Sequence, residues 1–132
     1  MTNAELARTF REIALYLEMR EEPFKPRAYE RVAYELEVLE EPVTEIYKTR
    51  GLKGLREIPG VGAAIAEKIE EIAKTGRLQY YQELKRDTPV DIAALTAVEG
   101  VGPKTVKALY AALGIKNVAD LERAARAGKI RG

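Results

Sequence analysis

The stretch Ile58–Ile69, IPGVGAAIAEKI, places a valine between two glycines, after a proline and before a run with helical spacing. A similar stretch, VEGVGPKTVKAL, occupies Val98–Leu109, and a shift of 40 residues aligns the two together with their flanking apolar positions. Glycines on both sides of one apolar residue permit positive φ angles and let another group approach the backbone without meeting a Cβ. The sequence therefore predicts two copies of a unit made of a helix, a Gly-Val-Gly hairpin and a second helix.

The rest of the chain also has helical spacing, and no stretch alternates as a strand does. Thr2 followed by Glu5 is a capping-box pattern that predicts the start of a helix. Pro26 suits the first turn of a second helix, and we expect Pro42 to close that helix. The predicted fold is all-α, a helical bundle containing two helix-hairpin-helix motifs. The two clearest apolar stripes consist of Leu6, Phe10, Ile13 and Leu17, and of Tyr29, Val32, Leu36 and Leu39.

The repeat also suggests a division of the chain. Residues 49–54, TRGLKG, are typical of a turn-rich connector. A long helix is predicted from Ala63 to Lys74, ending at Gly76, and a short one over residues 79–87. We place a domain boundary there, with the first hairpin in residues 1–87 and the second in residues 88–132. The chain closes with an amphipathic helix and a basic tail.

The composition excludes several kinds of site. Cysteine and histidine are both absent, which excludes zinc fingers, cysteine nucleophiles and imidazole bases. Residues 1–50 hold 8 Lys/Arg against 11 Asp/Glu, and residues 51–132 hold 14 against 10, so an anion-binding surface is expected in the later part. No apolar run has the length of a signal peptide or a membrane span. We expect a soluble monomer without a membrane partner, cytoplasmic and, in a prokaryote, nucleoid-associated.

A Gly-Val-Gly hairpin in front of a helix is suited to binding an anion. The unpaired N–H groups of the first helical turn carry about half a positive charge. Directed at nucleic acid, such amides contact phosphate without reading sequence, and they need little net charge. Side chains that add to the contact are Arg56 and Lys68 in the first copy and Lys104, Thr105 and Lys107 in the second. The residues leave open a protein-interaction bundle, in which the hairpins only pack helices together.

The two hairpins resemble those in the N-terminal part of family X DNA polymerases, the family of DNA polymerase beta. LREIPGVGAAIAEKIEEIAKTGRL, residues 55–78, resembles the hairpin of the small lyase domain, and PFKPRAYERVA, residues 23–33, resembles that domain's second helix. LTAVEGVGPKTVKALYAALGIKNVADL, residues 95–121, resembles the hairpin of the next subdomain, called fingers or DNA-binding thumb. The resemblance implies that the first hairpin holds the 5′-phosphate side of a DNA gap and the second holds the primer side.

The same resemblance implies roles for individual residues. Lys68 falls on the family's Schiff-base lysine, Tyr29 on the tyrosine that supports it, and Lys25 and Arg56 on two phosphate-pocket positions. No cofactor is required, but each hairpin of the family often binds Na⁺ or K⁺ through backbone carbonyls. The carbonyl positions are Arg56, Ile58 and Val61 in the first hairpin and Thr96, Val98 and Val101 in the second. The hairpin positions expected against DNA are Gly60, Val61, Gly62, Gly100, Val101 and Gly102.

The sequence departs from the family pattern at several positions. Phe24 stands where vertebrate members have a histidine that stacks on DNA, and its ring can also stack. Ala64 and Tyr80 replace two further lysines, which removes positive charge from the phosphate pocket. The palm, with its metal-binding aspartates, would follow Gly132. We therefore expect no polymerase activity from this fragment, and we expect the full-length parent to be a DNA-directed DNA polymerase.

Lys68 is the residue with a candidate covalent role. Schiff-base chemistry needs a neutral amine, and an ordinary lysine, with a pKa of about 10.4, is almost entirely charged at pH 7. Burial against Ile65 and Ile72, or the charge of Arg56, would favour a neutral amine, whereas Glu71 would oppose it. The sequence leaves open whether Lys68 is a nucleophile or a solvated phosphate contact.

The predicted function is sequence-nonspecific DNA binding at gaps or nicks with a 5′ phosphate, as the N-terminal part of a family X polymerase in base excision repair. A 5′-deoxyribose phosphate lyase activity at Lys68 is a further hypothesis. The alternative is a free-standing helix-hairpin-helix module without catalysis, which binds DNA or protein.

Overall fold

The computed structural model describes residues 1–130, and over this range its regular secondary structure consists of helices, without a strand. The all-α prediction is therefore confirmed, and the end of the predicted basic tail, Arg131 and Gly132, lies outside the described residues. None of the described helices combines the length and the apolar character needed to cross a bilayer. In chain order the helices are α1 (Asn3–Met19), α2 (Lys25–Val38), α3 (Val43–Arg56), α4 (Ala63–Thr75), α5 (Gln79–Asp87), α6 (Ile92–Thr96), α7 (Pro103–Leu113) and α8 (Val118–Arg126).

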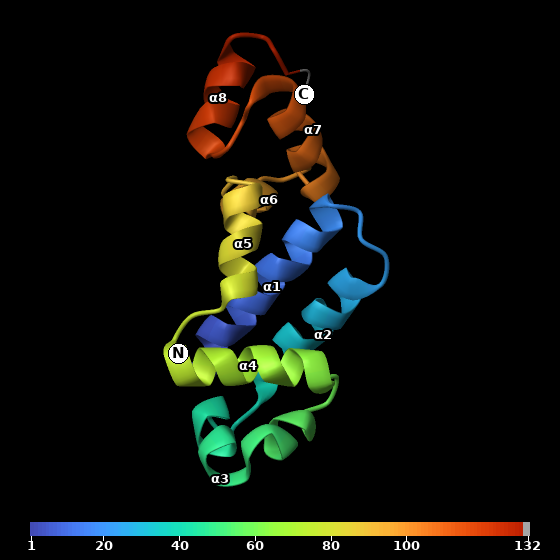
Figure 1. Ribbon diagram of the computed structural model, residues 1–132. Helices are drawn as coiled ribbons and strands as arrows, with labels where there is room; N and C mark the ends of the chain where they lie inside the picture. The colour runs from blue at the N-terminus through green and yellow to red at the C-terminus, as the bar shows by residue number, and fades with distance from the viewer. Residues whose placement is uncertain (131–132) are drawn as a thin grey trace.

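Helix α1 is the element that connects the two ends of the molecule. Its predicted capping box is formed: the Glu5 N–H donates to Thr2 Oγ1 at 3.1 Å, and the Thr2 N–H donates to Glu5 Oε1 at 3.3 Å. Its apolar stripe is buried, and α1 packs mainly against α2 while also contacting α5, α6 and α7. In Figure 1, α3 and α4 lie at one end and α7 and α8 at the other, with α1 between them.

The region around Pro42 differs from the prediction. Helix α2 ends at Val38, and Pro42 is the N-cap of α3 instead of the end of α2. Proline suits this place because its ring holds φ near the helical value, here −59°. An N–H at a helix start would have no partner within the helix, so the N–H that proline lacks is not missed there. The Asn3 side chain secures the connector, since its Oδ1 accepts the Val43 N–H at 2.9 Å. This contact spans 40 residues of sequence, so only the fold shows it.

Residues 49–54, predicted to be a connector, belong to α3. The helix kinks at Gly51, where φ is 62° and ψ is −152°, and then continues to Arg56. The glycine permits this kink because it has no Cβ to clash at positive φ. The glycine-rich composition therefore indicated a bend between two helical segments, and the expectation of a connector was wrong.

The later elements follow the prediction more closely. Helix α4 starts at Ala63 and ends at Thr75, with Gly76 in the left-handed conformation at φ 74°, and α5 covers residues 79–87. The segment after α5 is fastened to α1, because the Tyr16 hydroxyl donates to the buried Val90 carbonyl at 2.9 Å. The domain boundary after residue 87 stays a prediction.

Candidate nucleic-acid interface

The two Gly-Val-Gly turns have the same backbone geometry. Val61 and Val101 each donate their N–H to the carbonyl three residues earlier, at 3.0 Å in both turns. Gly60 and Gly100 have φ angles of 84° and 83°. A positive φ at the third residue of a four-residue turn is the type II pattern, which favours glycine at that place. The 40-residue repeat in the sequence is therefore a repeat in the backbone.

The helix that follows each turn begins without a side-chain cap. Gly62 is the N-cap of α4 and Gly102 is the N-cap of α7, and both are extended, with φ of −92° and −103°. A glycine has no side chain to accept the first amides, so these are left for water or an anion. In α4 the unpaired backbone N–H groups start at the exposed Ala63. Helix α7 starts with Pro103, which has no N–H, so the unpaired N–H groups of α7 start at Lys104.

The side chains around the second turn are only partly available to a ligand. Lys104 and Thr105 are exposed on the first turn of α7, as expected for DNA contacts. Lys107 instead donates to Glu21 Oε2 at 2.9 Å, in the loop between α1 and α2. This hydrogen bond, together with the charges of Lys107 and Lys104, lowers the pKa of Glu21. Sequence reasoning missed this partner because it lies 86 residues away along the chain.

Two residues with predicted roles, Tyr29 and Lys68, lie against the ring of Tyr80. The Lys68 ammonium lies 5.0 Å from the centre of the Tyr80 ring, in a cation–π contact. The same ring stacks on Tyr29 with centroids 6.3 Å apart, and Tyr29 stacks on Phe10 at 5.8 Å. The charge of Lys25 also acts on Tyr80. Tyr29 and Lys68 are therefore brought together by Tyr80, a residue that the sequence marked only as the loss of a lysine.

Burial raises the pKa of both tyrosines of this cluster. It raises the pKa of Tyr29 to about 12, with a smaller contribution from the neighbouring Tyr80. It also raises the pKa of Tyr80, against the opposing charge of Lys25. A tyrosine with an ordinary pKa is already neutral near pH 7, and burial extends this neutral state of both rings to higher pH. Lys25 itself is exposed and forms an ion pair with Glu22 at 3.4 Å.

Two predicted residues lie apart from the Tyr80 cluster. Arg56 lines a crevice of about 630 Å³ between α3 and the start of α4, beside Lys53 and the acidic Glu57 and Glu67. It therefore flanks the amides that follow the first turn. Phe24 is 89% exposed and has a φ of 67°, so its ring is open to solvent beside the first turn of α2.

The first turn has a neighbour that sequence reasoning did not find. A Cβ built on Gly60 would lie 3.2 Å from the Arg31 Cδ and 3.3 Å from its Nε. Nothing lies within 4 Å of the corresponding position on Gly100. Arg31 belongs to α2, and no spacing in the sequence relates it to the hairpin, so only the packing of the helices reveals the contact.

Two of the carbonyl oxygens expected to bind a cation, those of Ile58 and Val98, also accept hydrogen bonds within the turns. The Ile58 and Val98 carbonyls each accept one turn hydrogen bond, which leaves each oxygen a second lone pair. Over residues 1–130, no group of three or more His, Cys, Asp or Glu side chains is arranged to hold a metal ion.

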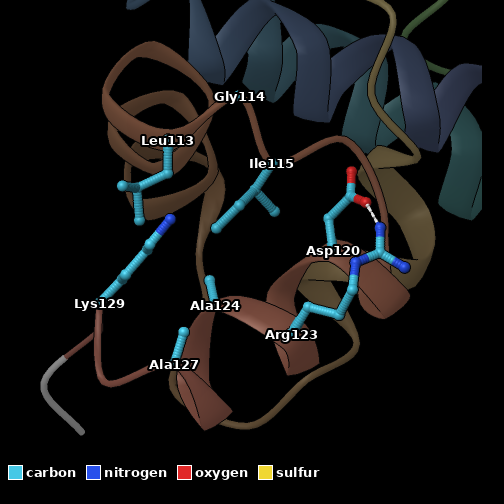
Figure 2. A pocket seen from close by; sticks show the side chains of 8 residues that line it. All are labelled: Leu113, Gly114, Ile115, Asp120, Arg123, Ala124, Ala127 and Lys129. Atoms are coloured by element: carbon cyan, nitrogen blue, oxygen red, sulfur yellow. Dashed lines mark hydrogen bonds and ion pairs between the residues drawn. The ribbon is translucent and has the colours of Figure 1, made fainter.

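A hollow at the far end of α7 is separate from both turns. Figure 2 shows it between α7, α8 and the segment after α8, with Ile115 at its floor and Lys129 at its rim. Its volume is about 420 Å³. Asp120 there is bonded to Arg123 and also accepts the Lys116 N–H at 3.0 Å, so its carboxylate is already occupied. None of the residues predicted for DNA binding lines this hollow.

Comparison with known proteins agrees with the two-hairpin architecture. Residues 1–78 match the model of the family described as helix-hairpin-helix domain, and residues 92–130 match a SAM-like helix-hairpin-helix tandem. The whole chain is 25% identical over 133 aligned positions to the DNA polymerase/3′-5′ exonuclease PolX of Bacillus subtilis (strain 168), covering 22% of that protein. Over 72 residues, 52% of the chain, it is 38% identical to DNA polymerase lambda of Arabidopsis thaliana, covering 14% of it. The chain thus spans less than a quarter of either relative, and the similarity confirms the resemblance to family X.

Proposed function

Because the chain belongs to the helix-hairpin-helix domain family, we propose that it binds DNA through its two Gly-Val-Gly turns and holds duplex at a gap or nick that bears a 5′ phosphate. The observation that carries the proposal is the identical geometry of two turns, each followed by a helix with uncapped amides. Two such anion sites on one molecule suit one continuous polyanion.

The mode of contact follows from the groups available. Backbone amides reach phosphate oxygens and carry no information on base sequence, so binding is expected to be nonspecific in sequence. The exposed Lys104 and Thr105 add a charge and a hydroxyl beside the second turn, and Arg56 adds a charge beside the first. Because phosphate contacts release counterions, the affinity should fall steeply with salt.

A binding assay tests this proposal directly. Fluorescence anisotropy would compare an intact duplex, a one-nucleotide gap and the same gap with a 5′ phosphate, each at several salt concentrations. We expect the phosphorylated gap to bind most tightly, with little change when the flanking sequence is scrambled. A chain that binds none of these at low salt would support the protein-interaction bundle and overturn the proposal.

Each hairpin is also proposed to hold a Na⁺ or K⁺ ion through the carbonyls at positions 56, 58 and 61 or 96, 98 and 101. The lone pairs left on the Ile58 and Val98 oxygens fit such an ion, because oxygen donors suit hard cations. Bound there, the cation supplies a positive charge next to a phosphate. DNA affinity should then fall when K⁺ is replaced by tetramethylammonium at equal ionic strength, and an unchanged affinity would exclude this role.

A second candidate function is 5′-deoxyribose phosphate lyase activity, which the cluster around Tyr80 favours. The neutral Lys68 amine would attack the sugar aldehyde, and the adduct would lose water to form an imine. Loss of a C2′ proton to water would then break the C3′–O bond and leave a 5′ phosphate on the DNA, and hydrolysis of the imine would free Lys68. Tyr29 would support this lysine through Tyr80, since both contact that ring. The cation–π contact opposes this reaction, because it stabilises the charged ammonium and only the neutral amine is a nucleophile.

Borohydride trapping separates these two candidates. The substrate is a duplex with a one-nucleotide gap and a 5′ deoxyribose phosphate, and the variants are Lys68→Ala and the control Lys74→Ala, on the same helix. A crosslink that is lost in Lys68→Ala and kept in Lys74→Ala would show that Lys68 forms the imine of the lyase reaction. Gap binding without any crosslink would leave DNA binding as the function of these residues.

A further inference from the structure

The side chain of Arg31 lies across the first Gly-Val-Gly turn. Its Cγ, Cδ and Nε would be 3.2 to 3.4 Å from a Cβ on Gly60, closer than most side chains approach a Cβ. The space exists because residue 60 is glycine. The stem of Arg31 therefore fits against residue 60 because that residue has no side chain, and the same lack of a side chain leaves the turn accessible to a ligand.

The guanidinium at the end of this stem is free to bind an anion. Arg31 is exposed, and within residues 1–130 it has no ion pair and no side-chain hydrogen bond. Other arginines are paired with carboxylates, such as Arg11 with Glu37 at 2.6 Å and Arg50 with Glu41 at 3.0 Å. Arg31 thus holds an uncompensated charge at a turn whose neighbouring amides favour an anion.

We propose that Arg31 is a phosphate-binding residue of the first hairpin, held over the Gly60 turn by its stem, so that one DNA phosphate is gripped by the backbone amides and by a side chain of α2. The inference rests on the proposed DNA binding and specifies its chemistry at this hairpin. A planar guanidinium can donate two parallel hydrogen bonds to phosphate oxygens, which neither an amide nor a lysine does alone.

The second hairpin lacks this arrangement. Nothing lies within 4 Å of the Cβ position on Gly100, and the charges near it, Lys104 and Lys107, come from the helix that follows the turn. The first hairpin thus takes its side-chain contact from another helix, and the second takes it from its own. The two hairpins should therefore differ in how much of their phosphate affinity depends on one arginine.

The test removes the charge of Arg31 while keeping its stem. Arg31→Met and the control Arg77→Met would be titrated with a 5′-phosphorylated gapped duplex at several salt concentrations. Arg77 is exposed and follows the far end of the 13-residue α4, roughly 20 Å from the turn. We expect Arg31→Met to bind about three- to tenfold more weakly at 0.1 M salt, with the slope of log affinity against log salt smaller by about 0.9. Arg77→Met should bind like the parent chain.

Two further measurements keep the outcomes distinct. Thermal unfolding of each variant checks that it folds, and Arg31→Lys, which keeps the charge without the planar fork, should recover only part of the affinity. If the parent chain binds the duplex and folded Arg31→Met binds equally well with the same slope, the role of Arg31 is overturned while the hairpin proposal stands. If the parent chain does not bind at all, the proposed function fails, and this inference fails with it.

Discussion

The turns at Gly60 and Gly100 adopt the same conformation, with φ of 84° and 83°, yet their surroundings differ. Val61 at the first turn is 6% exposed, whereas Val101 at the second is only partly buried. A side chain from another helix covers Gly60, and none lies near Gly100. The first turn thus anchors Ile58 and Val61 in the core, whereas Val98 and Val101 of the second turn are only partly buried.

This difference teaches that a repeated motif fixes the backbone but not its neighbours. A four-residue stretch with glycine at its third position forms the same turn in both hairpins. The turn hydrogen bond and the positive φ involve only residues within that stretch. The charge at each turn depends on which helix packs beside it. Lys107 illustrates this at the second turn, since Glu21 from the α1–α2 loop neutralises it. Similar sequences in the two hairpins therefore do not imply equal affinity for phosphate.

The largest expected effect comes from placing valine at the two turns. Gly60→Val and Gly100→Val should each weaken DNA binding by about tenfold or more, because a β-branched residue at positive φ distorts the turn and moves the amides. The loss should be greater for Gly60→Val, since the new side chain also displaces Arg31. Anisotropy on a gapped duplex measures the loss, and far-UV circular dichroism should show nearly unchanged helicity.

The control for this comparison is Gly76→Val. Gly76 has a φ of 74° and open space around it, so it carries the same backbone strain at a helix end away from both turns. Its affinity for DNA should stay close to that of the parent chain. Full affinity in both turn variants would contradict the assignment of the turns to DNA.

The next effect concerns stability and compares the valines of the two turns. Val61→Ala should lower the free energy of unfolding by about 2 kcal/mol, because two methyl groups leave a well-packed site. Val101→Ala should cost about half as much, since that side chain is already partly exposed. Urea unfolding measures both, and equal losses would show that the two turns are equally part of the core.

A smaller effect is expected from the ion pair at the second turn. Glu21→Gln should free Lys107 for DNA and raise DNA affinity about two- to threefold. The gain should be small because an exposed ion pair holds the lysine only weakly. The control is Glu37→Gln, which removes the same charge and breaks the exposed pair with Arg11, away from the residues assigned to DNA. If the two variants gain equally, net charge explains the gain, and Lys107 has no special role.

The smallest effect comes from making the first hairpin more like the second. Ala63→Pro copies Pro103 at the first helical position, which should stabilise the chain by about 0.5 kcal/mol through the unfolded state. It also removes one free amide of α4, so DNA affinity should fall slightly. Thermal unfolding and anisotropy together separate the two changes, and an unchanged affinity would show that the Ala63 amide does not touch the ligand.

Sequence reasoning was most successful where structure depends on near neighbours. The capping box of α1, the end of α4 at Gly76 and both turns were predicted, because each is specified by residues within a few positions of one another. It failed at Pro42 and at residues 49–54, where the same composition fits a helix end, a helix start or a kink. The choice there depends on contacts such as that of Asn3 with Val43, 40 residues apart.

By itself the sequence determined that this chain is helical and that it carries two hairpins with open helix N-termini, since periodicity, proline and glycine act over short distances. Only the tertiary structure decided what stands beside those hairpins. It placed Arg31 over Gly60, Glu21 on Lys107 and Tyr80 between Tyr29 and Lys68. Most of these contacts join segments that are far apart in the chain, and the packing that brings them together follows from the whole core.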